Sequence, residues 1–446
     1  MSGPLRVLMP SDVFPPRCGG AGWSAHTLAL ALIARGHAVT AIVPRRVAAR
    51  HARAAQLEDV LGVPTVRVDY WAPAAPIVQN YFRHERLWPR LADALVDSAA
   101  TMPAPGVPAP VIIHAQHVQA APAAIAAGRR LRAPAIITVR DQWPWDYFST
   151  GLHANRLPYP RQTWASLAAD LPLRLGFARG VPALAGIPYM LAHLRRRQQA
   201  LRQASAVIAV SAYIAGRLAP FVAPERLHVI PNMVDLAAVD AALAAPHTSL
   251  PIGKPYLLFV GKLERNKGAQ LLIEVFRALR AQEAESAGSD GAHPLAAPEL
   301  VIAGDGPLRP ALEHELAMLG VRTRFLDWAA HDDVLRLMAG CELLLFPSAW
   351  GEPLSRVPLE AGACGAAVLA MPTGGTPDII RDGVNGALEA TPRGFARRMA
   401  ALMADPAGRK ALGAAARHTV EQRFSPAAVA PRVEALYREL AAAFII

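Results

Sequence analysis

The sequence is poor in cysteine, in charge and in long apolar runs. Its three cysteines (Cys18, Cys341 and Cys364) are scattered, and no histidine accompanies them at metal-binding spacing. This pattern fits a reducing compartment and argues against a disulfide framework. The longest apolar tract, residues 181–194, is interrupted by Gly and Pro and is too short to span a bilayer. The first residues resemble no signal peptide. We therefore expect a cytoplasmic chain, soluble or attached peripherally to the inner face of the membrane.

The overall composition is that of a globular, basic protein. The chain has 446 residues, 53% hydrophobic and 18% charged, which excludes a disordered or fibrous protein and suggests two or three domains. Its net charge of +11 is carried mostly by Arg, so an anionic partner is expected: nucleic acid, an anionic membrane surface or a phosphorylated small molecule. Because no nucleic-acid reader motif accompanies the charge, we expect no nucleic-acid partner.

The first half opens with the pattern strand, glycine-rich loop, helix, strand. A strand is expected at residues 5–10, a loop ending in residues 19–22, a helix at 24–35 and a second strand at 38–43. This order is typical of a βαβ unit and therefore of a parallel sheet. Further continuous apolar runs, as in buried parallel strands, lie at residues 111–113, 135–139 and 206–210. Ser211 stands where the cap of the next helix is expected.

A second α/β series follows a boundary at residues 232–251. Its expected strands are residues 256–260, 299–303, 324–326, 343–346 and 367–370, with helices at 269–280 and 307–319. Residues 101–110 and 281–298 are expected to be surface loops because of their Pro-rich and Ala/Ser/Gly-rich compositions. The sequence thus predicts two parallel-sheet domains, each with a ligand site beyond the carboxyl ends of its strands.

Two glutamates follow the expected strand 343–346. Glu352 lies in the loop after this strand, and Glu360 lies on the second turn of a helix that starts near Ser355. A carboxylate is suited to accept hydrogen bonds from paired sugar hydroxyls, and the free N–H groups of a helix start are suited to a phosphate. Two isolated glutamates would more often be solvated surface residues. Their position at a strand end favours a binding site.

A second strand-end loop, residues 261–268, carries Lys262 and Lys267. Both could reach a diphosphate as point charges at the mouth of the sheet. They could equally be ordinary loop lysines, although this chain otherwise uses Arg far more than Lys. Glycine-rich turns at residues 304–307, 373–378 and 19–22 permit positive φ and a close approach of backbone to ligand. Their spacing is not that of the dinucleotide-binding fingerprint.

His114 and His117 come at the end of the first-half strand that begins at residue 111. A neutral imidazole donates and accepts at once, so His117 could contact a donor sugar or an acceptor. The alternative is a histidine satisfied by backbone at a strand end. The sequence does not decide which of the two histidines faces a site.

Taken together, these segments resemble the retaining glycosyltransferases of family 4, which have the two-domain GT-B fold with two Rossmann-like domains facing across a cleft. The resemblance covers nearly the whole chain and is more specific in the second half. It rests on the opening glycine loop, the strand with His114 and His117, the loop G-K-L-x-x-x-K-G, the turn A-G-D-G-P, the segment E-x7-E and the stretches at residues 374–378 and 382–386.

The resemblance implies that different parts of the chain bind the two substrates. Residues 1–235 would bind the acceptor, residues 236–424 the nucleotide-sugar, and residues 425–446 would form a helix that packs back towards the first domain. A sugar would move from a nucleotide-diphosphate-sugar donor to a glycan, lipid or small-molecule acceptor with retention of anomeric configuration. No metal or other cofactor is expected, in keeping with the lack of an Asp-x-Asp pair among the motifs found.

The resemblance also implies roles for individual residues. Glu352 would support the transferred sugar, and His117 would act beside it as a second catalytic residue. The donor-binding residues implied are Lys262, Lys267, Glu360, Ser355, Arg356 and Gly20. Among these, Lys262 stands where relatives usually carry Arg. Arg140 stands where many relatives carry His, which suggests a particular acceptor class or an anion contact.

Three questions stay open at the level of sequence. The basic tract 191–202 could rest on an anionic membrane or form a solvated helix face. The same cleft could serve a hydrolase, an epimerase or a phosphorylase. A non-catalytic nucleotide-sugar-binding protein is a further alternative, although both glutamates and both lysines are present. The sugar, the base and the acceptor have no readable code in the sequence.

Overall fold

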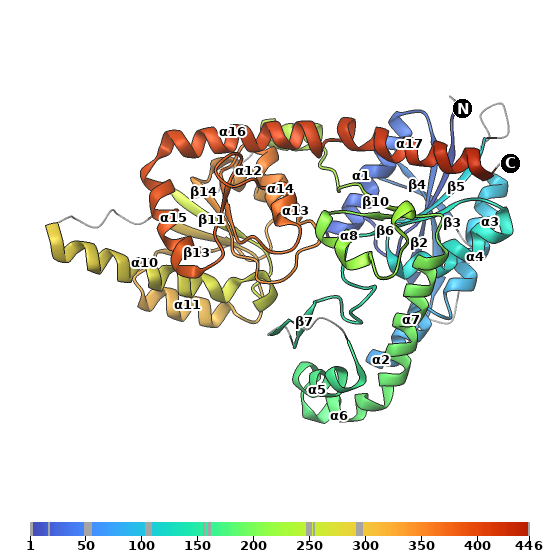
Figure 1. Ribbon diagram of the computed structural model, residues 1–446, viewed down its shortest axis with the longest axis horizontal. Helices are drawn as coiled ribbons and strands as arrows, with labels where there is room; N and C mark the ends of the chain where they lie inside the picture. The colour runs from blue at the N-terminus through green and yellow to red at the C-terminus, as the bar shows by residue number, and fades with distance from the viewer. Residues whose placement is uncertain are drawn as a thin grey trace. The chain divides into compact units, whose positions relative to one another are not determined.

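The computed structural model describes residues 3–16, 18–48, 56–102, 109–154, 157–158, 162–246, 252, 255–290 and 298–444. The chain forms two compact units, each built around its own sheet (Figure 1). Unit 1 comprises Met1–Ala154, Tyr159–Met233 and Pro426–Ile446, and unit 2 comprises Asn155–Pro158 and Val234–Ser425. The predicted α/β class with two parallel sheets is confirmed.

The sheet of unit 1 has eight strands in the order β10-β9-β6-β5-β1-β2-β4-β3, parallel except for the edge strand β3. The chain first builds outward from β1 to β2 and β4, and then returns to place β5 on the other side of β1. The strand order therefore reverses between β1 and β5, which is where open α/β sheets bind ligands. The strands are β1 (Arg6–Pro10), β2 (Ala38–Arg46), β3 (Gln56–Val60), β4 (Val63–Tyr70), β5 (Val111–Ala115), β6 (Ala135–Val139), β9 (Ala206–Ala209) and β10 (Leu227–Val229).

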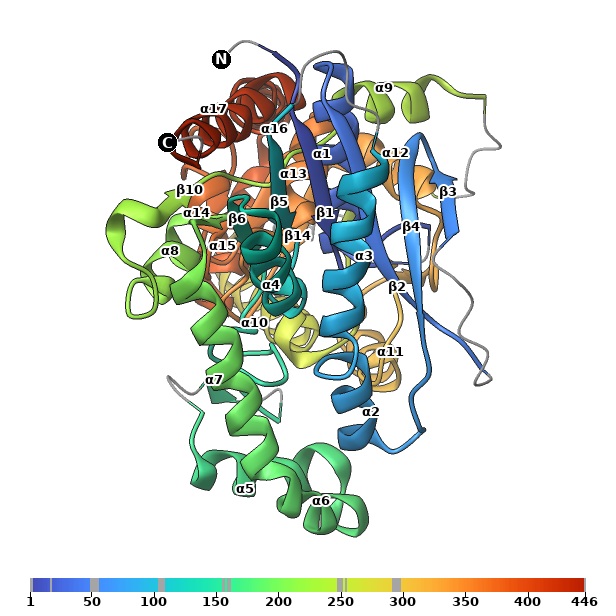
Figure 2. The same cartoon turned by 90° about the vertical axis from the view of Figure 1, so that its right-hand side faces the viewer.

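Helices cover this sheet: α3 and α4 pack side by side, and α17 packs along α1 (Figures 1 and 2). Val429, Val433 and Tyr437 of α17 belong to the same apolar core as Val7 and Ile112 of the sheet. The last helix is therefore an integral part of unit 1. The helices of this unit are α1 (Gly20–Ala34), α2 (Pro76–Arg83), α3 (Trp88–Thr101), α4 (Ala121–Leu131), α5 (Trp164–Leu175), α6 (Phe177–Ala183), α7 (Ile187–Gln203), α8 (Ala212–Leu218) and α17 (Pro426–Phe444).

The sheet of unit 2 has six parallel strands in the order β13-β12-β11-β14-β15-β16. Here the order reverses between β11 and β14, so the loops that follow these two strands meet at the switch point. The strands are β11 (Tyr256–Val260), β12 (Glu299–Ala303), β13 (Thr323–Phe325), β14 (Leu343–Phe346), β15 (Val368–Ala370) and β16 (Ala387–Leu388). Two-residue strands, β7 (Leu152–His153) and β8 (Leu157–Pro158), also occur.

The helices of unit 2 enclose a core that includes Phe259, Phe276, Leu345 and Phe395. They are α9 (Leu236–Ala244), α10 (Ala269–Asp290), α11 (Arg309–Met318), α12 (His331–Gly340), α13 (Arg356–Ala363), α14 (Thr376–Ile379), α15 (Pro392–Ala404) and α16 (Pro406–Arg423). Among the helices that the structure describes, none combines the length and apolarity that a bilayer crossing requires.

Two predictions about local structure need correction. Helix α1 begins at Gly20, so residues 20–22 are helical rather than part of a loop, and a Cβ on Gly22 would lie 2.5 Å from Cys18 Sγ. Helix α10 continues to Asp290 because residues 281–285 are Ala, Gln and Glu, all strong helix formers. The expected loop at 281–298 is therefore wrong up to residue 290, and residues 291–297 lie outside the described part, as do residues 103–108 of the other expected loop.

Candidate active-site residues of the two units

At the switch point of unit 2, the loops after β11 and β14 bring Lys267 and Glu352 together. Lys267 Nζ lies 2.7 Å from Glu352 Oε1, and the Ser348 hydroxyl donates to the same oxygen at 2.8 Å. The ammonium also lies 5.0 Å from the centroid of the Trp350 ring, a cation–π contact. Because the Glu352 side chain is only 4% exposed, these contacts compensate a nearly buried carboxylate.

Glycines allow these loops to approach one another. Gly268 has φ +74°, and a Cβ there would lie 1.7 Å from the carbonyl oxygen of Pro347. Gly374 has φ +57°, and a Cβ there would lie 2.2 Å from the carbonyl oxygen of Glu352, which also accepts a hydrogen bond from the N–H of Gly375. In the predicted turn at residues 373–378, the close approach is therefore one of backbone to backbone, and it fixes the backbone of Glu352. The approach of backbone to a ligand stays a prediction.

The second predicted glutamate, Glu360, lies on α13 between two basic side chains. Arg356, one turn earlier, donates to Glu360 Oε1 from Nε at 3.0 Å and from Nη2 at 2.7 Å. His331, the first residue of α12, places Nε2 3.1 Å from the same oxygen. Within the described part of the chain, all of these contacts fall on Oε1. The other oxygen, Oε2, is therefore available to a ligand.

These neighbours also set the charges of the cluster. Burial alone would raise the pKa of Glu360, but Arg356 and His331 together lower it below its usual value. In return, the hydrogen bond to Glu360 raises the pKa of His331. Glu360 is therefore an anion at neutral pH, although its side chain is only 8% exposed. Arg356 was predicted to serve the donor, and the structure places its guanidinium on Glu360.

The other two donor residues predicted in unit 2, Lys262 and Ser355, take no part in the contacts described above. Lys262 is exposed on the loop after β11. Ser355 is the N-cap of α13, with extended backbone and no hydrogen bond from its side chain to the helix. Across the residues that the structure describes, no group of three or more His, Cys, Asp or Glu side chains is arranged to hold a metal ion.

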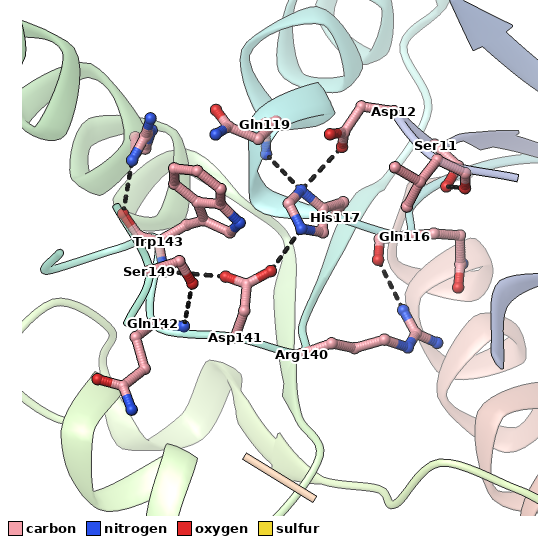
Figure 3. Close-up of polar contacts among 12 residues, drawn as sticks. Ser11, Asp12, Gln116, His117, Gln119, Arg140, Asp141, Gln142, Trp143 and Ser149 are labelled. Carbon is pink, nitrogen blue, oxygen red and sulfur yellow. Dashed lines mark hydrogen bonds and ion pairs between the residues drawn. The ribbon is translucent and has the colours of Figure 1, made fainter. Parts of the chain in front are cut away.

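In unit 1, His117 lies between two carboxylates (Figure 3). Its Nδ1 is 2.8 Å from Asp12 Oδ1, and its Nε2 forms an ion pair with Asp141. These three residues follow β1, β5 and β6, so the carboxyl ends of three neighbouring strands bring them together at the switch point. The backbone N of Gln119 is also 3.4 Å from Nδ1; because the contact with Asp12 is shorter, we place the Nδ1 proton there.

The two carboxylates make His117 a stable cation. Burial alone would lower its pKa, but the charges of Asp12 and Asp141 raise the pKa of His117 to about 10. The pKa of Asp12 is lowered in turn: burial raises it, and the charges of His117 and Arg83 outweigh that effect. The neutral imidazole considered from sequence is therefore replaced by an imidazolium with both N–H groups engaged.

Arg140 directly follows β6 and precedes Asp141, and its guanidinium lies beside Gln116 (Figure 3). Its Nη1 donates to the carbonyl oxygen of Gln116 at 2.7 Å, and its Nε donates to Asn232 Oδ1 at 2.9 Å. Burial lowers the pKa of Arg140 to about 10. The guanidinium thus helps to hold the loops of unit 1 together, and the particular acceptor class or anion contact suggested from sequence stays a prediction.

The structure distinguishes the two histidines. His114 is fully buried, with Nδ1 2.5 Å from the Tyr437 hydroxyl and Nε2 2.6 Å from Thr138 Oγ1. It therefore links β5 to β6 and to α17 as a structural residue, whereas His117 belongs to the strand-end cluster. Gly20, predicted to bind the donor, is the exposed first residue of α1.

Sequence reasoning did not single out several members of these clusters. Asp12 and Asp141 each stand two residues beyond a strand, so the rule that ligands bind at carboxyl strand ends would have found them. Ser348 and Trp350 lie in the same loop as Glu352, close to the predicted glutamate. His331 lies on a different helix from Glu360 and carried no local signal.

Comparisons with known protein families give matches in both units. Residues 18–238 match the family described as Glycosyltransferase Family 4, and residues 245–419 match the family described as Glycosyl transferases group 1. Alpha-maltose-1-phosphate synthase from Mycobacterium tuberculosis strain H37Rv is 30% identical over 274 residues, which cover 55% of this chain and 66% of that protein. A D-inositol 3-phosphate glycosyltransferase from Mycobacterium sp. strain KMS is 32% identical over 168 residues, 37% of this chain and 36% of that protein. The chain thus spans less than two thirds of the length of these relatives.

Solved structures resemble the chain over nearly its whole length. Anabaena HepE, in complex with UDP-glucose, has a TM-score of 0.62 at 18% identity and covers 98% of this chain and 100% of its own. Sucrose-phosphate synthase from Thermosynechococcus elongatus has a TM-score of 0.65 at 21% identity, with the same coverage. The catalytic domain of starch synthase IV from Arabidopsis thaliana, bound to ADP and acarbose, has a TM-score of 0.66 at 16% identity and covers 99% and 100%. At these identities the likeness is one of fold, and the predicted GT-B class is confirmed.

Proposed function

Because the chain belongs to the glycosyltransferases that these families describe, Family 4 and group 1, we propose that it transfers a sugar from a nucleotide-diphosphate-sugar to an acceptor. The acceptor would be a glycan, a lipid or a small molecule. The observation that carries the proposal is the gathering of Lys267 and Glu352 at the switch point of unit 2, with Glu360 on the helix that follows. Retention of anomeric configuration rests on the family resemblance alone.

The positive groups of unit 2 suit the diphosphate of a donor. Departure of a nucleoside diphosphate builds negative charge on phosphate, and fixed cations and N–H dipoles stabilise that charge more in the transition state than in the ground state. Lys267 and Lys262 would supply the cations. The N–H groups at the start of α13, near Ser355 and Arg356, would supply the dipoles, since no side chain caps them. This set of charges requires no metal or cofactor.

The Lys267–Glu352 pair would change partners when the donor binds. A diphosphate competes with Glu352 for the ammonium, because phosphate oxygens carry more charge than the carboxylate. Glu352, still held by Ser348 and by the backbone contacts of Gly374 and Gly375, would then accept hydrogen bonds from hydroxyls of the transferred sugar. We assign it the support of sugar and charge rather than a nucleophilic role.

Glu360 would bind the ribose of the donor. Arg356 and His331 hold Oε1, and a free Oε2 on an ionised carboxylate is a strong acceptor for a ribose hydroxyl. Solved structures of the same fold contain UDP, UDP-glucose or ADP, which makes uridine and adenosine diphosphate sugars the first donors to test.

Unit 1 would bind the acceptor through the cluster of Asp12, His117 and Asp141. Carboxylates held in place by an imidazolium are good acceptors for sugar hydroxyls, and the cation offsets their charge. We keep the division of roles expected from sequence, with residues 1–235 and the returning helix 425–446 on the acceptor side and residues 236–424 on the donor side. If the acceptor is a lipid, we also propose a peripheral contact of the chain with the membrane.

A donor screen tests the proposal. Thermal unfolding and sugar release or transfer would be measured with UDP-, GDP-, ADP- and dTDP-sugars, for the wild type and for Glu360→Gln and Lys267→Met. We expect one donor class to stabilise the wild type and neither variant. Free sugar as the main product in the presence of acceptors would indicate a hydrolase. Stabilisation without any turnover would indicate a binding protein.

A further inference from the structure

Unit 1 contains a groove that the proposed reaction does not use. It has a volume of about 470 Å³ and lies between α7, α8 and the loop that follows β6. Its walls are formed by Trp145, Gln162, Leu191, Leu194, Arg195, Gln198, Arg202, Gly216, Arg217, Pro220 and Phe221. None of these residues belongs to the cluster around His117 or to unit 2. The volume is in the range of small-molecule sites in proteins.

The spacing of residues along α7 explains how the groove forms. Each of residues 191, 194, 195, 198 and 202 has another member of this set three or four positions away, so they share one face of the helix. Gln198 on this face donates to the carbonyl oxygen of Pro144 at 2.9 Å, which fixes the loop that carries Trp145. From α8, the guanidinium of Arg217 lies 5.1 Å from the Trp145 ring centroid. The loop that carries Trp145 is thus in contact with both α7 and α8.

The structure also revises the picture of the basic tract 191–202. Arg197 is almost fully buried, donates to the carbonyl oxygen of Trp143 at 3.0 Å and lies over the rings of Trp143 and Tyr147. Arg196 pairs with Glu85 at 3.1 Å. The arginines of this tract therefore point in different directions, and only Arg195 and Arg202 face the groove. The tract is not one solvated basic face.

The groove combines positive charge with an apolar wall. Arg195 and Arg202 are seven residues apart, which separates them by roughly 10 Å along the helix axis. Leu191, Leu194 and Phe221 provide apolar surface. Within the described part of the chain, no Asp or Glu lines the groove. A ligand that matches it must carry negative charge and an apolar portion together.

We propose that this groove is a second ligand site, which binds a phosphate ester that carries an aliphatic chain. The phosphate would lie between the guanidinium groups of Arg195 and Arg202 and pair with both, because the fork of an arginine matches phosphate oxygens and both long side chains line the groove. The chain would cover Leu194 and Phe221 and displace water from them. Two sources, a soluble amphiphile and a membrane lipid, would supply this chemistry, and the site does not depend on the transfer reaction.

Octyl phosphate, titrated calorimetrically into the full chain below its micellar concentration, tests the charge requirement. We expect saturable binding of one molecule, and binding weakened about tenfold or more by Arg195→Gln or Arg202→Gln, since each removes a charge-assisted contact. Arg179→Gln is the matched control, because Arg179 is an exposed arginine of α6 outside the groove. Equal binding by octyltrimethylammonium or by inorganic phosphate would overturn the proposal.

Gly216→Leu tests the apolar wall without removing any contact. A Cβ on Gly216 meets no atom within 4 Å, so the leucine side chain has room to extend into the groove. Leucine also favours the helix over glycine. We expect unchanged or higher thermal stability and a loss of octyl phosphate binding. Unchanged binding in this variant would place the ligand elsewhere and contradict the site.

Lipid vesicles distinguish the two sources of the phosphate ester. Flotation would be measured with phosphatidylcholine vesicles that contain phosphatidylglycerol, for the wild type, Arg202→Gln and Gly216→Leu. Flotation lost in both variants would identify a membrane lipid as the ligand. Flotation absent in the wild type, with octyl phosphate still bound, would identify a soluble amphiphile. A cooperative thermal unfolding transition like that of the wild type serves as the control that these variants are folded.

Discussion

The ammonium of Lys267 lies on the carboxylate of Glu352, 2.7 Å from Nζ to Oε1, although the two residues are 85 positions apart in the chain. They meet because β11 and β14 are adjacent parallel strands at the switch point of unit 2. This contact joins the residue proposed for the diphosphate to the residue proposed for the sugar. It explains why loss of either side chain should affect both folding and turnover.

Lys267→Met should lower turnover by at least about a hundredfold, because it removes a cation from the leaving group. It should also destabilise unit 2 by about 1–3 kcal/mol, since the buried Glu352 side chain would keep, among the described residues, the Ser348 hydroxyl as its one side-chain partner. Turnover and denaturant unfolding would be measured together. Lys262→Met is the matched control for stability, because Lys262 is exposed; equal unfolding of both variants would contradict the role of the ion pair.

The pair of His331 and Glu360 should give a pH-dependent contribution to stability. The pKa of His331 is raised in the folded state, so its contribution is fully present below its unfolded pKa and is lost as the pH rises through the folded value. His331→Gln should therefore be less stable than the wild type near pH 5.5 and equally stable near pH 9. The difference should stay below about 1 kcal/mol because His331 is half-exposed. A difference that grows with pH would have the wrong sign.

His117 should remain protonated through the neutral range. Its pKa of about 10 in the folded chain lies above the usual value, so its stabilising contribution is complete below about pH 6.5 and lost as the pH rises towards 10. NMR of the imidazole carbons should show no titration of His117 between pH 6 and 8.5. Asp141→Asn should move the titration to lower pH, since it removes one of the two carboxylates. A wild-type midpoint near 6.5 would refute the two-carboxylate arrangement.

Tyr437→Phe tests the link between α17 and the sheet. It removes the hydroxyl 2.5 Å from His114 Nδ1 and leaves a buried ring nitrogen without its partner, which should cost about 1–3 kcal/mol of unfolding free energy. Phenylalanine retains the aromatic packing of α17. Calorimetric unfolding provides the measurement. An unchanged melting temperature would show that the hydrogen bond contributes little.

Much of the fold could be predicted from sequence because parallel strands form continuous apolar runs. The strands at residues 256–260, 299–303 and 343–346 are confirmed at the predicted positions. Strands β3 and β4 were missed, since β3 carries Gln56, Glu58 and Asp59, and β4 contains Pro64. Polar side chains are tolerated in β3 because it is an edge strand that pairs only with β4. Pro64 is tolerated because it is the second residue of β4 and precedes the pairing with β2, which starts at Thr65.

The candidate sites, like the fold, could be predicted only in part. Glu352 and His117 could be named because each lies just beyond a strand end in a recognisable motif, and Glu360 because it lies on the helix that continues the motif of Glu352. The side-chain partners could not be deduced, because contacts such as His331 with Glu360 join separate helices. The three consecutive arginines at residues 195–197 illustrate the limit: the sequence does not show that only the third is buried.

The most direct test of the donor site is a titration of nucleoside diphosphate. Of UDP, GDP, ADP and dTDP, the one that most stabilises the wild type would be titrated calorimetrically into the wild type, Glu360→Gln and Lys267→Met, with Arg179→Gln as control. We predict that affinity falls at least about tenfold in the first two variants, as loss of a charge-assisted contact requires, and is unchanged in the control. Wild-type affinity in both Glu360→Gln and Lys267→Met would contradict the assignment of these residues to the nucleotide.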